Sequence, residues 1–184
     1  MKNKLILIGG YCAAGKSTFA RRLSQELNIP YFERDTIDET ICDSFGRESN
    51  VYKMSSENVA HDIMLHIAER LLQVGQPFIL ESIFGLKEIE EIKKLLEKYK
   101  YECLLFILKG NPEVMFARYV ERDKSGERHW IHNPAHKDWF INEMPKGKLE
   151  EAEIEQKIIV DTTEFEKVDY KSLFIAAKKF IVNN

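Results

Sequence analysis

The chain has 184 residues, of which 44% are hydrophobic and 11% aromatic, enough apolar material for one well-packed domain. Lysine and arginine total 27 against 30 aspartate and glutamate residues, so the net charge is −3. This balance excludes a strong overall attraction to nucleic acid or to an anionic membrane, although a local basic cleft stays compatible with it. The three cysteines, Cys12, Cys42 and Cys103, form no CxxC pair, which favours reduced thiols and a cytoplasmic location.

Short apolar runs alternate along the chain with longer stretches of helical period. We expect five strands, at residues 5–8, 31–32, 78–80, 103–108 and 158–160. Helical periodicity marks residues 19–27, 59–72, 89–99, 114–120 and 173–181. Strands that alternate with helices predict an α/β fold with a parallel sheet covered on both faces. No apolar run is long enough to cross a bilayer, so we expect no contact with a membrane.

Two polar regions interrupt this alternation. Residues 36–58 are polar and broken, and together with the helix at 59–72 they predict a helical insert over about 36–75. Residues 123–150 are rich in charge and carry two tryptophans but show no strand pattern, which favours a lid. The remaining segments would form the core of a single domain spanning 1–184, namely residues 1–35, 76–122 and 151–184.

The most informative pattern directly follows the first strand. Residues 10–17 read GYCAAGKS and match G-x-x-x-x-G-K-[ST], a loop that binds nucleotide phosphates, without a mismatch. Glycines and small side chains let backbone N–H groups curve around a phosphate, Lys16 would reach the β- and γ-phosphates, and Ser17 would offer its hydroxyl to Mg²⁺. We therefore predict an ATP site, with Mg²⁺, formed by Gly10, Cys12, Ala13, Ala14, Gly15, Lys16, Ser17 and Thr18.

Element order and motifs resemble those of the small P-loop kinases, the group of nucleoside monophosphate, shikimate and gluconate kinases. The resemblance rests on the loop at 10–18, the sequence FERD at 32–35, FARYVER at 116–122, and Arg128 followed by histidine in the lid. Within the group the chain is most similar to the branch of zeta toxins, chloramphenicol phosphotransferases and polynucleotide 5′-kinases. The resemblance implies a three-layer fold with a five-stranded parallel sheet of order 2-3-1-4-5, a helical substrate-side insert and a lid.

Asp35, at the end of the second strand, is the candidate catalytic base, and a helix N-cap is its alternative role. Arg118 and Arg122 are four residues apart and would share a helix face. The resemblance implies that Arg118 packs on adenine, that Arg122 reaches phosphate and that Arg128 arrives with the closing lid. A solvated, salt-bridged helix face is the alternative for the first two arginines.

The remaining candidate residues follow later strands or lie in the insert. Glu81 would hold Mg²⁺ through water, or would contact substrate together with Ser82. Thr162 would flank adenine, and Arg47 is a candidate for substrate contact. The lid also contains His129, His132 and His136, whose spacing suits one helix face, but Pro134 interrupts such a helix, which favours substrate contact or plain polar surface over a zinc site.

These features predict an ATP-dependent kinase that transfers the γ-phosphate to a hydroxyl of a small metabolite, nucleotide, sugar nucleotide or antibiotic. Two alternatives are an ATP-binding switch without a phosphoryl acceptor and a nucleic-acid 5′-hydroxyl kinase. No long run of lysine and arginine supports an extended nucleic-acid groove, so we expect a small-molecule partner rather than nucleic acid. We expect a monomer or a homodimer.

Overall fold

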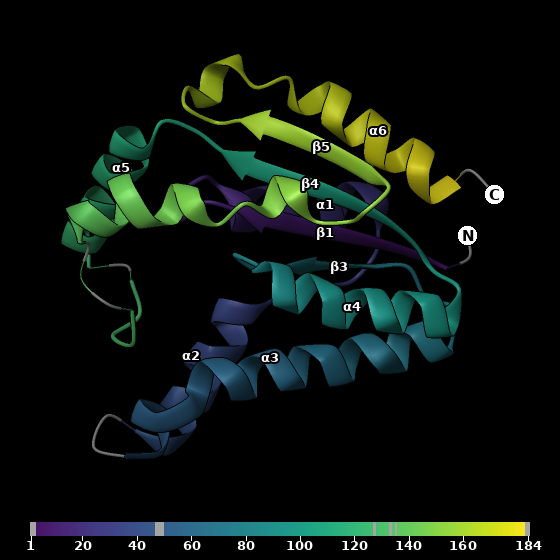
Figure 1. Ribbon diagram of the computed structural model, residues 1–184, viewed down its shortest axis with the longest axis horizontal. Coiled ribbons are helices and arrows are strands. Elements are labelled where there is room, and N and C mark those ends of the chain that lie inside the picture. Colours follow the sequence, from purple (N-terminus) through teal and green to yellow (C-terminus); the bar gives the residue numbers. More distant parts are fainter. Residues whose placement is uncertain (1–2, 47–49, 127, 133, 135, 183–184) are drawn as a thin grey trace.

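The computed structural model describes residues 3–46, 50–126, 128–132, 134 and 136–182 (Figure 1). One parallel sheet contains five strands in the order β2-β3-β1-β4-β5. Their bounds are β1 (Lys4–Gly10), β2 (Tyr31–Glu33), β3 (Phe78–Glu81), β4 (Glu102–Lys109) and β5 (Gln156–Asp161). The predicted strand order is confirmed, and each strand extends beyond its predicted apolar centre.

Helices cover both faces of the sheet. On one face lie α3 (Asn50–Gln73) and α4 (Leu86–Tyr99), and on the other lie α1 (Lys16–Leu27) and α6 (Tyr170–Val182). Side chains alternate along β1, so Leu5 and Leu7 belong to the core under α3 and α4. Ile6 and Ile8 belong to the core under α1 and α6. Every residue of β1 is buried, as expected for the central strand of a doubly covered parallel sheet.

Two helices follow β2 and pack against each other at one end of the sheet: α2 (Arg34–Phe45) and the first turns of the long helix α3. The prediction of a broken polar stretch up to residue 58 is wrong for its second half, since α3 begins at Asn50. Residues 50–58 contain neither glycine nor proline, so nothing in their backbone stops the helix that starts there from continuing. The polar composition of residues 50–58 therefore does not mark an interruption, because these residues belong to α3.

After α5 (Pro112–Lys124) the chain forms short helical turns, and the described residues of 125–155 contain no strand. These turns are η1 (Trp139–Glu143), η2 (Met144–Lys146) and η3 (Leu149–Glu151), and η4 (Phe165–Lys167) follows β5. The carboxyl ends of β1, β4 and β5 point toward the side of the molecule where α2 and the segment after α5 lie (Figure 1). Ligands of parallel α/β sheets bind at this edge. No helix among the described residues has the length and apolar character needed to cross a bilayer.

Candidate active site

The loop between β1 and α1 has the backbone of a phosphate cradle. Gly10 has φ of 121°, and a Cβ there would lie 2.0 Å from the carbonyl oxygen of Leu108, so only glycine fits. Ala13 and Gly15 also have positive φ, 58° and 83°. Left-handed residues in a tight loop turn successive N–H groups toward one concavity, and α1 adds the positive end of its dipole. The sequence GYCAAGKS therefore folds into the anion-binding turn that its pattern predicts.

Three polar side chains meet beside this loop. The Lys16 amine donates a hydrogen bond to the carbonyl of Tyr11 at 2.9 Å and lies 3.9 Å from the Glu81 carboxylate. The Ser17 hydroxyl donates to the other oxygen of Glu81 at 2.9 Å. Glu81 ends β3 beside β1, which explains how residues 64 positions apart come into contact. A hydroxyl and a carboxylate next to a phosphate loop are hard oxygen donors that fit Mg²⁺.

Glu81 is only 4% exposed, and its environment changes its proton affinity. Burial raises its pKa from 4.5 to about 7, nearby Lys16 opposes that rise, and Asp35 adds to it. The Ser17 hydrogen bond also stabilises the charged form. A carboxylate held this close to neutrality is more common at functional sites than elsewhere in proteins.

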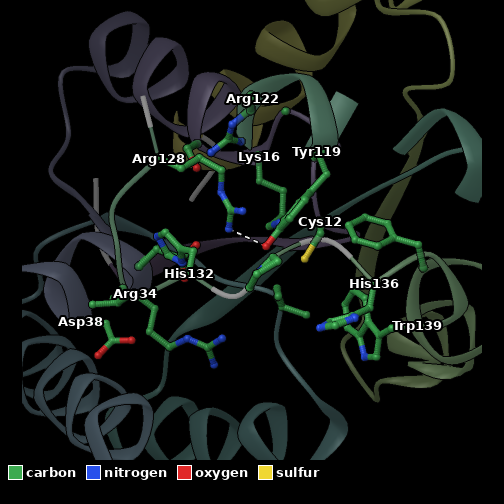
Figure 2. A pocket seen from close by; sticks show the side chains of 18 of the residues that line it. Cys12, Lys16, Arg34, Asp38, Tyr119, Arg122, Arg128, His132, His136 and Trp139 are labelled. Carbon is green, nitrogen blue, oxygen red and sulfur yellow. Dashed lines mark hydrogen bonds between the residues drawn. The ribbon is translucent and has the colours of Figure 1, made fainter. Parts of the chain in front are cut away.

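A cavity of about 710 Å³ opens from the phosphate loop toward α2 and the segment after α5 (Figure 2). Its walls include ten of the predicted site residues: Cys12, Ala13, Gly15, Lys16, Ser17, Thr18, Asp35, Glu81, Arg122 and Arg128. The fold therefore brings together residues from the loop after β1, from α1, α2, β3 and α5, and from the predicted lid segment. This volume suits a small organic ligand together with the end of a triphosphate.

Two arginines contribute positive charge to the cavity beside Lys16 (Figure 2). Arg122 is exposed on α5, and no hydrogen bond or ion pair links its guanidinium to another described residue. Arg128 donates to the Tyr119 hydroxyl at 2.5 Å and to Asp123 at 3.0 Å. Its guanidinium carbon also lies 3.9 Å from the centre of the Tyr119 ring, a cation–π contact that fixes its position over the loop. Arg128 is thus held in place by α5 rather than by the lid alone.

Arg118 points elsewhere, although it lies one helical turn before Arg122. Its guanidinium donates to the carbonyls of Thr162 and Thr163 at 2.7 and 2.9 Å. It also stacks 3.7 Å from the ring centre of Phe165, which lies beside Gly15. Thr162 itself is fully buried and its hydroxyl donates to the backbone. Both residues lie behind the phosphate loop and not on the cavity wall, so their contact with adenine stays a prediction.

Asp35 lies in the first turn of α2 and is exposed at the cavity wall. The alternative role of Asp35 as an N-cap of a helix starting at Thr36 is wrong, because α2 begins at Arg34 and its N-cap is Glu33. No ion pair involves Asp35 within the described part of the chain. Its carboxylate is close enough to raise the pKa values of Glu81 and Cys12 electrostatically.

The predicted lid segment contacts α2 across the mouth of the cavity. His132 contacts the Glu39 carboxylate at 2.7 Å, and His129 contacts Asp43 at 2.9 Å. The indole nitrogen of Trp130 donates to the same Asp43 oxygen at 3.1 Å. Two of the three lid histidines therefore pair with carboxylates, and the third, His136, lines the cavity.

Five predicted residues are not on the cavity wall, and one lies outside the described residues. Gly10 and Ala14 shape the loop from behind, and Arg118 and Thr162 contact each other as described. Ser82 is buried, and its hydroxyl has no hydrogen-bond partner among the described residues. Arg47 belongs to the segment 47–49 that is not described.

Arg34, Tyr119 and Trp139 also line the cavity, although none of the three was predicted as a site residue from the sequence. Trp139 was used there only as a sign of an ordered lid. Tyr119 precedes Arg122 by three residues on α5, a spacing that could have placed both on one face. Arg34 directly precedes Asp35 in the second of the quoted motifs. For Trp139 no local signal was present, because its segment has neither strand nor long helical periodicity.

A three-layer α/β fold with a phosphate loop after β1, an acidic end of β3 and cationic α5 and lid residues defines the class of P-loop proteins with a kinase-like fold. Residues 5–138 match the AAA domain family AAA_33, and the chain belongs to that family. No curated protein matches the chain closely enough to be compared.

Several solved structures share the fold. A candidate kinase from Chloroflexus aurantiacus is 23% identical, with a TM-score of 0.85 over 98% of this chain and 97% of that one. The APS kinase CysC of Mycobacterium tuberculosis, in complex with AMPPNP and APS, is 11% identical, with a TM-score of 0.63 over 98% of each chain. A structure from the PezAT chromosomal toxin–antitoxin system of Streptococcus pneumoniae is 23% identical, with a TM-score of 0.62 over 92% of this chain and 71% of that one. At these identities the similarity is one of fold.

Proposed function

We propose that this protein is an ATP-dependent phosphotransferase that moves the γ-phosphate of ATP to a hydroxyl group of a small molecule. One observation carries the proposal: a single cavity joins the phosphate loop, the carboxylate of Asp35 and the cations Arg122 and Arg128. Phosphoryl transfer needs an in-line acceptor, neutralised phosphate oxygens and often a group that takes the hydroxyl proton. The cavity supplies one candidate for each of these tasks and leaves room for an acceptor.

The phosphate loop and three cations, Lys16, Arg122 and Arg128, would bind the phosphates of ATP. Backbone N–H groups from Ala13 to Ser17 would hold the β-phosphate, and Lys16 would leave the Tyr11 carbonyl to bridge the β- and γ-phosphates. Arg122, whose guanidinium has no partner among the described residues, and Arg128 would neutralise the oxygens of the transferring group. Ser17 and Glu81 would hold Mg²⁺, which supplies further charge neutralisation on the phosphates when bound.

Asp35 is the proposed base. The acceptor oxygen would form a bond to the γ-phosphorus while the bond from that phosphorus to the β,γ-bridging oxygen breaks, and the hydroxyl proton would pass to the Asp35 carboxylate. The exposed, unpaired state of Asp35 suits this task, because a carboxylate already committed to an ion pair would be a weaker base. ADP and the phosphorylated acceptor are the products.

We further propose a division of labour along the single domain. Residues of about 36–75 would act as the substrate-side insert, and residues 123–150 would close over the acceptor and exclude water. The contacts of His132 and His129 with α2 support this assignment, since they join the two segments across the cavity mouth. The fold similarity to the PezAT structure is in keeping with a place in the zeta-toxin branch.

Transfer of radioactive γ-phosphate tests the proposal. The protein is incubated with γ-labelled ATP, Mg²⁺ and a deproteinised small-molecule extract, and the label is followed by thin-layer chromatography. Label in a small organic molecule supports the kinase. Label found only in inorganic phosphate indicates a switch NTPase, and label on the 5′ end of an added RNA oligonucleotide indicates a nucleic-acid kinase. The same assay compares the variant Lys16→Ala with a matched control, Lys178→Ala, which substitutes an exposed lysine of α6.

A further inference from the structure

The cavity extends beyond the phosphate loop, and the walls of that second half come from α2 and the lid. Asp38 lies on α2, and His136, Asp138 and Trp139 lie on the lid segment. Figure 2 shows Asp38 on one side of the cavity and His136 and Trp139 on the other. A phosphoryl acceptor bound in this half of the cavity would lie against these side chains.

Arg34 and His132, two side chains that line this half of the cavity, already contact acidic residues. Arg34 donates to Glu88 at 2.9 Å, and its side chain is mostly buried in that pair. His132 contacts Glu39 at 2.7 Å. An incoming phosphate or carboxylate would therefore have to compete with Glu88 for Arg34 and with Glu39 for the His132 ring, at a cost in affinity.

Two carboxylates in the same half have no cationic partner within the described part of the chain. The Asp38 carboxylate accepts only a weak hydrogen bond from the Cys42 thiol at 3.8 Å. Asp138 accepts a hydrogen bond from the side-chain amide of Asn142 at 2.7 Å and forms no ion pair. A third lining carboxylate, Glu143, is instead compensated by Lys146 at 2.7 Å. The acceptor half therefore presents uncompensated negative charge, whereas the phosphate half presents positive charge from Lys16 and Arg122.

Trp139 adds an aromatic surface to this negative wall. Trp139 lines the cavity and is 40% exposed, and its ring meets that of Phe140 edge to face, with ring centres 5.2 Å apart at 83°. An open indole face attracts a cation and also packs well against the C–H face of a saturated ring. The carboxylates of Asp38 and Asp138 and the exposed indole all favour a cationic ligand, and the indole also favours one with a saturated ring.

We infer that the acceptor is a polyhydroxylated amine of the amino-sugar type, held between Trp139 and the carboxylates Asp38 and Asp138. This inference rests on the proposed function, because it names the compound whose hydroxyl is phosphorylated. The protonated amine pairs with Asp38 or Asp138, the ring lies on Trp139, and a hydroxyl faces Asp35 and the γ-phosphate. Acceptors that carry a phosphate or carboxylate are rejected by the same wall.

Four matched compounds test the inference: glucosamine, glucose, gluconate and glucose 6-phosphate, which share a six-carbon skeleton and differ in charge. Each is titrated calorimetrically into the protein saturated with AMP-PNP and Mg²⁺, so that binding is read without turnover. Glucosamine is expected to bind about tenfold more tightly than glucose, and the two anions more weakly still. Tighter binding of an anion, equal binding of glucosamine and glucose, or binding of none of the four overturns the inference.

Variants locate the interaction. Asp38→Asn should remove the preference for glucosamine over glucose and leave AMP-PNP affinity unchanged. Trp139→Ala should weaken glucosamine about tenfold and Trp139→Phe much less, while Glu143→Gln, whose carboxylate is already paired, should preserve the order of affinities. An Asp38→Asn variant that keeps the full preference contradicts the assignment.

A parallel assay of ADP release separates the two proposals. If glucosamine binds in the expected order and no phosphate moves to any acceptor, the kinase proposal fails and the chemistry of the pocket stands. If phosphate is transferred to gluconate or glucose 6-phosphate in preference to glucosamine, the kinase proposal stands and the amino-sugar inference fails.

Discussion

The two halves of the cavity are built in different ways. The phosphate half comes mainly from consecutive residues of one loop, in which backbone conformation at Gly10, Ala13 and Gly15 determines the shape. The acceptor half comes from α2 and the lid, whose contacting residues Glu39 and His132 lie 93 positions apart. The first half is specified by local sequence and by glycine sterics, so it binds a ligand common to many proteins. The second is specified by side chains brought together by the fold, so it is where specificity can vary.

The largest expected effect lies in the phosphate half. Lys16→Ala should reduce phosphoryl transfer about 1,000-fold or more, because it removes the cation nearest the β- and γ-phosphates. Thermal unfolding should show a folded protein, since the Lys16 amine contributes one hydrogen bond to a loop carbonyl. Steady-state kinetics with the Lys178→Ala control checks the result, and near-normal turnover would disprove the phosphate-site assignment.

The substitution Asp35→Asn tests the proposed catalytic base, which would face both the γ-phosphate and the acceptor hydroxyl. Loss of the base should lower kcat about 100-fold with little change in the KM for ATP, because the amide cannot take the acceptor proton. The parallel substitution Asp38→Asn should instead act on the acceptor KM. Equal losses of kcat and of ATP affinity in the Asp35 variant would argue against a base.

The ionisation of Glu81 should make the free energy of unfolding depend on pH. Its folded-state pKa of about 7 lies above 4.5, so between these values the native state holds a proton that the unfolded chain has released. Stability should therefore fall as pH rises through this window, by up to about 3 kcal/mol, and stay level above it. Glu81→Gln should flatten the fall and lose Mg²⁺-dependent turnover. Urea unfolding at pH 4.5 and pH 8 without nucleotide measures the free energy of unfolding of the wild type and of Glu81→Gln. An equal loss of stability in both proteins would show that Glu81 does not cause the pH dependence.

Arg122→Ala should produce a moderate defect confined to phosphate chemistry. Because the guanidinium is exposed and has no partner in the described structure, its removal should leave stability unchanged. Loss of a charge-assisted contact to the γ-phosphate should reduce kcat/KM about 30-fold. Arg118→Ala is the comparison: it should destabilise the fold through the lost contacts to Thr162 and Thr163. A stability loss equal in both variants would contradict the separation of their roles.

The smallest effect is expected from the lid contact. Glu39→Gln weakens the attraction to His132 across the cavity mouth, a pair that is partly exposed and so contributes about 0.2–1 kcal/mol. Hydrolysis of ATP without acceptor should then rise about two- to fivefold, since a lid that opens more often admits water. Phosphate release measures this, and high salt should reduce the difference between variant and wild type. Unchanged hydrolysis at low salt would show that this pair does not control closure.

The sequence pattern alone predicted the parallel sheet and the phosphate loop, and the resemblance to the small P-loop kinases implied the strand order. Alternating apolar runs fix strands and helices locally, and GYCAAGKS fixes a backbone that few other residues permit. It also identified Asp35, Glu81, Arg122 and Arg128 as site candidates, because each lies next to a strand end or an informative motif. Helix α3 was missed at its start, since a polar sequence without glycine or proline can continue a helix without an apolar signal.

Only the tertiary structure decided which charges are compensated and which are open to a ligand. Arg118 and Arg122 are equivalent by spacing, yet one is fixed on Phe165 and two carbonyls and the other faces the cavity. Likewise Asp38 has no cationic partner among the described residues, whereas Glu143 pairs with Lys146, a difference that depends on neighbours supplied by folding. The physical reason is that phosphate binding depends on backbone shape, which a few consecutive residues encode, whereas acceptor choice depends on side chains that meet only in three dimensions.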